Sequence, residues 1–330
     1  MAQRTLEIVT ETFSLARPFH ISRGVKESAG LIRAAIGERG HIGEGECCPY
    51  PRYGETVETV LKTLEDVRQK IEQGLGRIQL QKLLPPGAAR NALDCALWDL
   101  EAKIGSQSVA DLTGFSPPRT FSTMRTVVIG APENMAKEAA GYPQGVPLKV
   151  KLDMENVPAR LAAIKKGAPG SPIIIDANEG WDEDFLESIL PELKSFGVIL
   201  LEQPLPAGKD EALRRLERLV PVCADEACHA SADLPRLTGL YDAINIKLDK
   251  TGGLTGALAL FAAAKKQGFK IMLGCMVSSA LSIAPISHLC SHANYIDLDG
   301  PLLLAGGGGA GMSEVPGTAK VKLNAKWGRP

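Results

Sequence analysis

The most constraining feature of this sequence is a regular succession of short apolar segments that end in ionisable residues. In the C-terminal two thirds, eight such segments alternate with helix-like stretches. The candidate strands are Arg125–Ile129, Leu148–Leu152, Pro172–Asp176, Val198–Glu202, Val222–Asp225, Ala243–Leu248, Lys270–Gly274 and Tyr295–Asp299. Strands that are apolar throughout are typical of parallel sheets covered on both faces by helices. The pattern therefore predicts an α/β protein.

Eight successive βα units favour a (β/α) barrel over an open sheet. A barrel requires functional side chains at the C-terminal ends of its strands, where they meet around one mouth. Six strand ends meet this requirement with an ionisable residue, and the first five follow one another at intervals of 22 to 26 residues. These residues are Lys151, Asp176, Glu202, Asp225, Lys247 and Asp297. A set in such regular register is not explained by a solvated surface.

The N-terminal part has a different pattern, which predicts a separate α+β domain over residues 1–118. A strand at Thr5–Val9 and a hairpin formed by Leu31–Ile36 and His41–Gly45 are followed by two amphipathic helices. The Ser-Pro-Pro-Arg turn near residue 118 marks the boundary, so we assign the barrel to residues 119–305. The tail, 306–330, is expected to pack back on the first domain. Its Gly306–Gly309 run is interpreted as a connector, because no strand–turn–helix pattern surrounds it.

Composition excludes several classes of function. The 330 residues carry 37 Lys and Arg against 38 Asp and Glu, a net charge of −1, which argues against nucleic-acid binding. The seven cysteines include no CxxC pair, so neither a disulfide framework nor a zinc knuckle is indicated. The uncharged stretch between Lys270 and Asp297 contains too many polar groups for a membrane span. With an acid as early as Glu7, we expect a cytoplasmic protein, compatible with a homo-oligomer.

Three of the strand-end residues are carboxylates on consecutive strands. Asp176, Glu202 and Asp225 would repel one another in a half-buried mouth unless a cation held them. Hard oxygen ligands suit Mg²⁺ better than zinc, so we predict one Mg²⁺ ion per subunit. The alternative is that one or two of them pair with neighbouring lysines.

The lysines predict acid–base chemistry. Lys149 and Lys151 share one face of their strand, and Lys247 lies three strands beyond Asp176, on the far side of the barrel. A cation and a second lysine nearby disfavour the charged form of a lysine. They therefore lower its pKa, so that it can act as a base near neutral pH. One lysine could remove a proton α to a carboxylate while the metal holds the enediolate, and the other could return a proton to the opposite face. Either lysine alone could instead form a salt bridge.

These motifs resemble those of the enolase superfamily over nearly the whole chain. They stand here as Lys149-Val-Lys151, Asp176-Ala-Asn178, Glu202-Gln-Pro204, Ala224-Asp225-Glu226 and the segment 245–253. The combination is similar to the muconate-lactonizing subgroup. The resemblance implies a modified (β/α)7β TIM-type barrel with an N-terminal capping domain. It also implies Lys151 and Lys247 as the acid–base pair, Lys149 as an electrostatic helper near the substrate carboxylate, and the three carboxylates as Mg²⁺ ligands.

Within the subgroup, the last strand indicates the substrate. Asp297 and Asp299 share a face and suit an ammonium group, which a dipeptide offers at its N-terminus. The sequence here is similar to L-Ala-D/L-Glu epimerases, which invert the C-terminal residue of a dipeptide from murein peptide. The resemblance places a cation for the glutamate side chain on a mobile N-terminal loop, 18–26, where Arg23 is the first candidate and Lys26 the second. Thr126 matches a position that contacts substrate.

Other functions remain open at this point. An o-succinylbenzoate synthase or a cycloisomerase has the same architecture, but their substrates carry no ammonium group for Asp297 and Asp299. A Schiff-base aldolase with Lys247 as nucleophile would not need three metal carboxylates. A non-catalytic binding barrel should have lost a base or a ligand. The sequence therefore favours a Mg²⁺-dependent dipeptide epimerase.

Overall fold

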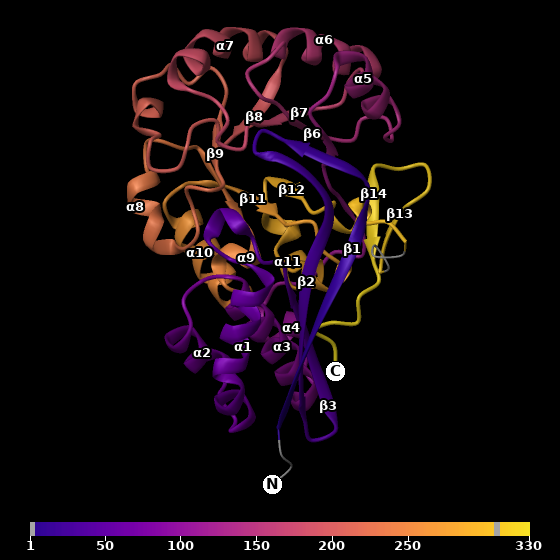
Figure 1. Cartoon of the computed structure of the whole chain (residues 1–330), viewed down its shortest axis with the longest axis vertical. Helices are drawn as coiled ribbons and strands as arrows, with labels where there is room; N and C mark the ends of the chain where they lie inside the picture. Colours follow the sequence, from indigo (N-terminus) through magenta and orange to yellow (C-terminus); the bar gives the residue numbers. More distant parts are fainter. Residues whose placement is uncertain (1–3, 307–310) are drawn as a thin grey trace.

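The N-terminal domain is built on a three-stranded antiparallel sheet in the order β1-β2-β3. The computed structural model describes residues 4–306 and 311–330. Strands β1 (Thr5–Ile21) and β2 (Gly24–Glu38) form a hairpin much longer than β3 (His41–Cys47). In Figure 1 this hairpin rises from the N-terminal domain to the barrel, with its turn near β6 and β7. The hairpin therefore brings N-terminal residues to the barrel mouth.

Helices α1 (Val57–Glu72), α2 (Arg77–Leu83), α3 (Ala88–Gly105) and α4 (Val109–Thr113) complete this domain. Thr56 caps α1 by accepting a hydrogen bond from the Thr59 amide, which satisfies a free donor of the first turn. Strand β3 lies directly on α3, because a Cβ added at Gly45 would stand 2.2 Å from the Ala92 carbonyl oxygen. Glycine is needed there for this close approach of two backbones.

The second domain is a parallel eight-stranded sheet in the order β12 to β5. Its strands are β5 (Arg125–Val127), β6 (Leu148–Lys151), β7 (Ile173–Asp176), β8 (Val198–Glu202), β9 (Val222–Ala224), β10 (Ala243–Ile246), β11 (Lys270–Gly274) and β12 (Tyr295–Asp297). The Met124 amide donates to the Ile296 carbonyl over 2.9 Å, which links the two edges. The sheet is thereby closed into a barrel.

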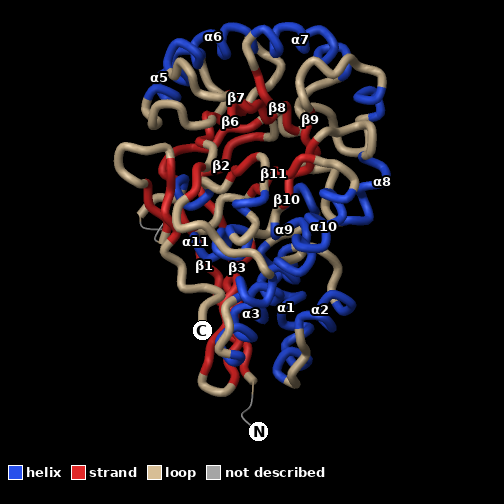
Figure 2. Tube along the Cα trace, turned by 180° about the vertical axis from the view of Figure 1, so that it is seen from behind, coloured by secondary structure: helices blue, strands red, loops and turns tan. Residues whose placement is uncertain are grey.

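Helices cover the outside of the barrel (Figure 2). They are α5 (Pro132–Ala140), α6 (Val157–Gly167), α7 (Glu183–Ser195), α8 (Leu234–Leu237), α9 (Leu248–Thr251), α10 (Leu254–Lys266) and α11 (Ala280–Ser287). A large apolar cluster fills the space between strands and helices. A smaller cluster fills the barrel interior and includes Ile174, Leu200 and Met272. This inner layer closes the bottom of the barrel below the polar strand ends.

The C-terminal tail contacts both domains. Strands β13 (Met312–Glu314) and β14 (Lys320–Leu323) form a small sheet with β4 (Phe121–Ser122). Farther on, the Trp327 indole donates to the Glu44 carbonyl over 2.9 Å and to the Cys95 carbonyl over 3.1 Å. Most of the Gly306–Gly309 run lies outside the described residues.

The predicted fold class is confirmed, and all eight predicted barrel strands occur with ends that differ by at most two residues. Two expectations for the N-terminal domain were wrong. The first strand continues to Ile21 instead of ending at Val9, and residues 18–26, expected as a loop, form the end of the β1–β2 hairpin. Pro18 is tolerated because it lies between Ser14 and Phe19, where the register with β2 shifts. Among the described residues, no helix is both long and apolar enough to cross a bilayer.

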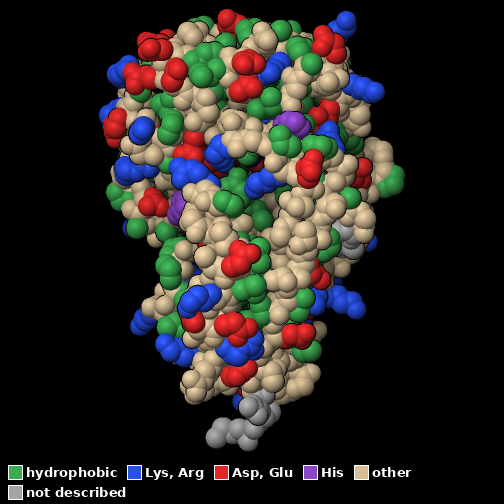
Figure 3. Space-filling view, viewed as in Figure 1, with side chains coloured by type: hydrophobic (Ala, Val, Ile, Leu, Met, Phe, Trp, Pro, Cys, Tyr) green, Lys and Arg blue, Asp and Glu red, His purple; other side chains and the backbone are tan. Residues whose placement is uncertain are grey.

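Both signs of charge are mixed over the face shown in Figure 3, and neither sign forms a broad patch. This distribution agrees with a net charge of −1. A polyanion would find no continuous basic surface on this face.

Candidate active site

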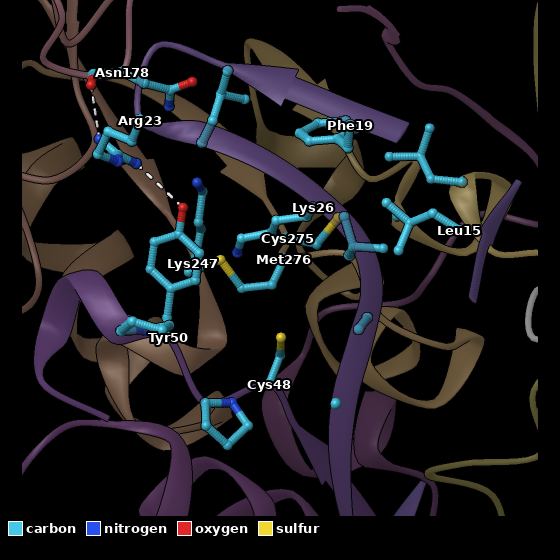
Figure 4. A pocket seen from close by; sticks show the side chains of 18 of the residues that line it. Leu15, Phe19, Arg23, Lys26, Cys48, Tyr50, Asn178, Lys247, Cys275 and Met276 are labelled. Carbon is cyan, nitrogen blue, oxygen red and sulfur yellow. Dashed lines mark hydrogen bonds between the residues drawn. The ribbon is translucent and has the colours of Figure 1, made fainter. Parts of the chain in front are cut away.

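A cavity of about 500 Å³ lies between the C-terminal ends of the barrel strands and the β1–β2 hairpin. Its barrel side is lined by Lys149, Lys151, Asp225, Lys247, Asp297 and Asp299, among others. Its other walls come from the hairpin and from the segment 48–57 of the N-terminal domain. Figure 4 shows Phe19 and Lys26 from the hairpin facing the same space as Lys247. Both domains therefore build one site.

Strand register places the predicted carboxylates side by side. Asp176 at the end of β7 pairs with Glu202 at the end of β8, and Asp225 follows directly after β9. All three are almost inaccessible to solvent, at 1% exposure or less. Lys151 pairs with Asp176 in the same register. The parallel ladder thus sets Lys151, Asp176 and Glu202 at one level of the barrel, and Asp225 follows two residues after Cys223, the partner of Glu202.

Lys149 lies among the carboxylates. Its Nζ is 3.0 Å from Asp176 Oδ2, 2.7 Å from Glu202 Oε2 and 2.7 Å from Asp297 Oδ2. Burial alone would lower the pKa of Lys149, but Asp176, Asp297 and Glu202 outweigh burial and raise it well above its usual value. Lys149 is therefore a fixed positive charge.

Lys151 and Lys247 stand on opposite walls, since β6 and β10 are four strands apart in the eight-stranded order. Lys151 Nζ donates to Asp176 Oδ2 over 2.6 Å and to Asn178 Oδ1 over 3.1 Å. Lys247 Nζ donates to Asp225 Oδ2 over 2.7 Å.

The expected lowering of the pKa of Lys247 by its neighbours is not what this arrangement produces. Burial and the Lys149 ammonium do lower it. The adjacent Asp225 carboxylate, however, outweighs both and raises the pKa of Lys247 well above its usual value.

The three carboxylates differ in their electrostatics. Burial and the Asp176 carboxylate raise the pKa of Glu202 to about 7. Burial also acts to raise the pKa of Asp176, but Lys149 and Lys151 outweigh it and hold the value below its usual range. Asp225 behaves likewise, because Lys247 and Lys250 offset its burial. The site thus depends on its cations to keep these buried groups ionised.

The donor set fits a hard cation, although the side chains are not arranged as a finished coordination shell. Within the described residues, no three Asp, Glu, His or Cys side chains are grouped closely enough to hold a metal ion as they stand. The Lys149 ammonium lies between Asp176 and Glu202 instead. Two buried carboxylate oxygens, Glu202 Oε2 and Asp297 Oδ1, make no hydrogen bond. Carboxylates from three consecutive strands provide the hard oxygen ligands that Mg²⁺ prefers.

Asp297 and Asp299 both line the cavity, but each already has a partner. Asp297 Oδ2 accepts from Lys149, whereas its Oδ1 makes no hydrogen bond. Asp299 Oδ2 accepts from the Thr126 amide over 2.9 Å. Burial and the Asp297 carboxylate raise the pKa of Asp299 to about 6. Thr126 therefore contacts Asp299 through its backbone, and its side chain also lies in the cavity lining.

The hairpin turn spans the barrel mouth. Arg23 Nη1 lies 2.8 Å from Glu226 Oε1 and donates to the Asn178 carbonyl over 2.8 Å, and Nη2 donates to Tyr50 Oη over 3.2 Å (Figure 4). Lys26 differs, because its Nζ stands 4.1 Å over the Tyr50 ring and no ion pair holds it among the described residues. Both line the cavity, but Lys26 is the cation available to an incoming carboxylate.

Several polar residues that contact this site did not stand out in the sequence. Lys250 donates to both Asp225 Oδ1 and the Asp225 carbonyl, and Asn245 Nδ2 donates to Glu202 Oε1 over 2.8 Å. Both lie in the segment 245–253 that carries the family resemblance. That motif was the only available signal, since neither residue terminates an apolar run.

The fold and this site define a class of enzyme. Residues 133–299 match the model described as enolase C-terminal domain-like, and residues 3–114 match the N-terminal domain of mandelate racemase / muconate lactonizing enzyme. The chain belongs to the enolase superfamily.

Two curated relatives are close in sequence. An L-Ala-D/L-Glu epimerase of Escherichia coli strain K12 is 47% identical over 304 residues, 92% of this chain and 95% of the relative. An N-acetyl-D-glutamate racemase of a Pseudoalteromonas species is 45% identical over 276 residues, 83% of this chain and 87% of the relative.

Solved structures agree with this placement. An enolase family member from Agrobacterium tumefaciens with homology to dipeptide epimerases, with bound sodium and L-Ala-L-Glu, has a TM-score of 0.94. It is 44% identical to this chain, and the alignment covers 98% of this chain and 100% of the Agrobacterium tumefaciens chain. A dipeptide epimerase from Methylococcus capsulatus, complexed with Mg and L-Arg-D-Lys, has a TM-score of 0.86 at 30% identity, with 99% of each chain covered.

Proposed function

We propose that this protein is a Mg²⁺-dependent dipeptide epimerase that inverts the α-carbon of the C-terminal residue, with L-Ala-D/L-Glu as its substrate. The observation that carries the proposal is the placement of two buried lysines, Lys151 and Lys247, on opposite walls of one cavity. Inversion requires removal of a proton from one face of the carbon and delivery to the other. Opposed amines of the same chemical type suit both directions of such a reaction.

The two lysines would act in alternate protonation states. One, as the neutral amine, accepts the α-proton, and the electron pair left on carbon is delocalised into the adjacent carboxylate as an enediolate. The other, as an ammonium, returns a proton to the opposite face. After turnover the two lysines have exchanged roles, and no proton is gained or lost overall. Lys149, held charged by its carboxylate neighbours, would stabilise the negative charge nearby.

Asp176, Glu202 and Asp225 would hold one Mg²⁺ ion per subunit. Bound there, the ion would supply electrostatic stabilisation of the charge that develops on the substrate carboxylate. The Methylococcus capsulatus relative with Mg and a dipeptide supports this assignment by similarity.

The ends of the cavity would select the two ends of the dipeptide. Asp297 and Asp299 would receive the N-terminal ammonium, because Asp297 Oδ1 is buried and still without a hydrogen bond. Lys26 would receive the glutamate side chain, since Arg23 is already held by Glu226 and the Asn178 carbonyl. A place in murein peptide metabolism belongs to the same proposal, through its substrate.

A second substrate deserves a direct comparison, because one relative at 45% identity is an N-acetyl-D-glutamate racemase. N-acetylglutamate has no ammonium group for Asp297 and Asp299, so the dipeptide fits this cavity better. An o-succinylbenzoate synthase and a cycloisomerase are disfavoured on the same ground. A Schiff-base aldolase is disfavoured because it would not need the three buried carboxylates Asp176, Glu202 and Asp225.

The test is incubation of the enzyme with Mg²⁺ and L-Ala-L-Glu in D₂O, followed by NMR and mass detection. We expect one deuterium at the glutamate α-carbon and accumulation of L-Ala-D-Glu. Faster exchange with N-acetylglutamate than with the dipeptide would assign the other substrate. Absence of α-exchange with both, and across a dipeptide library, would refute the proposed proton transfer.

A further inference from the structure

One short segment of the barrel, Asn245–Lys250, contacts two of the three proposed metal ligands from behind. It comprises the end of β10 and most of α9, and it also carries Lys247. Lys247 lines the cavity, whereas Asn245 and Lys250 do not. Their contacts therefore reach Asp225 and Glu202 from outside the cavity lining.

Lys250 is a fully buried lysine whose acceptors all lie in the wall of the site. Its Nζ donates to Asp225 Oδ1 over 2.7 Å, to the Asp225 carbonyl over 2.6 Å and to the Asn245 carbonyl over 2.7 Å. Three acceptors satisfy all three N–H groups of an ammonium. Since one residue provides two of them, Lys250 fixes both the backbone and the carboxylate of Asp225. The other oxygen, Oδ2, is the one that Lys247 contacts at the cavity.

Asn245 makes a comparable contact with Glu202, through one oxygen of its carboxylate. Its Nδ2 donates to Glu202 Oε1 over 2.8 Å, and Oε2 lies 2.7 Å from the Lys149 ammonium. Gly274 on the neighbouring strand makes this possible, because a Cβ there would stand 2.4 Å from Asn245 Oδ1 and 2.9 Å from Lys247 Cε. In both carboxylates one oxygen is thus held by the segment 245–250, and the other contacts a lysine that lines the cavity, Lys247 for Asp225 and Lys149 for Glu202.

We infer that Lys250 and Asn245 are positioning residues, which orient Asp225 and Glu202 so that one oxygen of each is presented to a divalent cation. The inference rests on the proposed function, which makes these carboxylates ligands. Lys250 also offsets one of the three negative charges of Asp176, Glu202 and Asp225 with an ammonium that does not line the cavity. Residues that hydrogen-bond to a metal ligand commonly orient that ligand and change the affinity of the site for the metal.

The experiment measures binding of Mn²⁺ alone, by electron paramagnetic resonance of the free ion, to the full chain without substrate. Mn²⁺ takes the same hard oxygen ligands as Mg²⁺. The variants are Lys250→Met and Asn245→Leu, and the matched control is Arg90→Met. Arg90 is also a buried cation that donates to this part of the chain, to the Thr251 carbonyl over 2.6 Å and the Gly252 carbonyl over 3.1 Å. It reaches neither carboxylate.

We expect Lys250→Met and Asn245→Leu to weaken Mn²⁺ binding by about 10- to 100-fold, with Arg90→Met close to wild type. At saturating Mg²⁺, the KM for L-Ala-L-Glu should stay close to wild type in both variants, because neither side chain lines the cavity. Should Lys250→Met lose its native circular dichroism spectrum, Asn245→Leu decides the question, since leucine keeps the branch at Cγ and removes the amide donor.

The possible failures can be told apart. Wild type that binds Mn²⁺, with both variants binding it equally well, overturns the positioning inference and leaves the proposed function standing. An equal loss in Arg90→Met also overturns it, because the effect would then be general disturbance of the segment. Wild type without any Mn²⁺ affinity removes the proposed ligand set, and the inference falls with it.

Discussion

Asp249 offers a quantitative test of the electrostatics of this interior. Its Oδ1 accepts hydrogen bonds from the Cys48 amide over 3.0 Å and from Asn91 Nδ2 over 2.8 Å, both in the N-terminal domain. These donors favour the carboxylate, but burial outweighs them and raises its pKa from 3.8 to about 7. The change we consider is Asp249→Asn, which keeps an acceptor oxygen at this position and removes the ionisation.

The sign of the pH effect follows from linkage. Because the pKa is higher in the folded than in the unfolded protein, the contribution to stability is complete below about pH 4 and is lost as pH rises through 7. A shift of one pKa unit corresponds to about 1.4 kcal/mol. Integrated from pH 5 to pH 8, the loss for Asp249 is on the order of 2 to 3 kcal/mol. That is a substantial part of the 5 to 15 kcal/mol that stabilises a typical domain.

The assay is urea unfolding followed by circular dichroism at pH 5 and pH 8, with a chelator in both buffers. Wild type should lose about 2 to 3 kcal/mol more between the two pH values than Asp249→Asn does. Asp66→Asn, in an exposed position of α1, is the control and should behave like wild type. An Asp249→Asn protein with the same pH dependence as wild type would show that Asp249 ionises normally in the fold.

Four further predictions concern the reaction. Lys151→Ala and Lys247→Ala should each reduce epimerisation by about 10²- to 10⁴-fold, while each still exchanges the α-proton of one epimer; normal turnover removes that residue from the pair. Asp297→Asn should raise the KM for the dipeptide by about 10- to 100-fold and leave Mn²⁺ affinity nearly unchanged; equal loss of both would place it on the metal. Lys26→Met should lower kcat/KM for L-Ala-L-Glu about tenfold relative to L-Ala-L-Ala; an unaltered preference excludes Lys26 as the selecting cation. Chelation should abolish activity and Mg²⁺ restore it, and full activity in metal-free enzyme contradicts the ligand assignment.

The barrel could be predicted from the sequence because its strands are buried on both faces and therefore appear as short uninterrupted apolar runs. The same geometry made the strand ends visible, since Asp176 or Glu202 interrupts an apolar run only where the run reaches the mouth. The expected proton-transfer chemistry followed from the types of these residues and their spacing, and the class of enzyme from the resemblance of the motifs to the enolase superfamily. Register then brought them together as the ladder requires.

Contacts between distant segments could not be predicted in this way. The β1–β2 hairpin is half exposed and contains Pro18, so its length was underestimated. The partners of Asp249 come from Cys48 and Asn91, about 200 and 160 positions earlier. The pKa of Lys247 depends on Asp225 at 2.7 Å, a distance that no spacing in the sequence specifies.

Because the hairpin turn lies over the barrel mouth, the residues proposed to select the substrate and those proposed to transfer protons belong to different domains. The groups proposed to move protons belong to barrel strands, whereas Lys26 and the aromatic side chain beneath it belong to the N-terminal domain. Substitutions in that turn can therefore alter which peptides enter without touching the proton-transfer groups. New substrate ranges could arise in this lineage by exchange of a few N-terminal residues over an unchanged catalytic base.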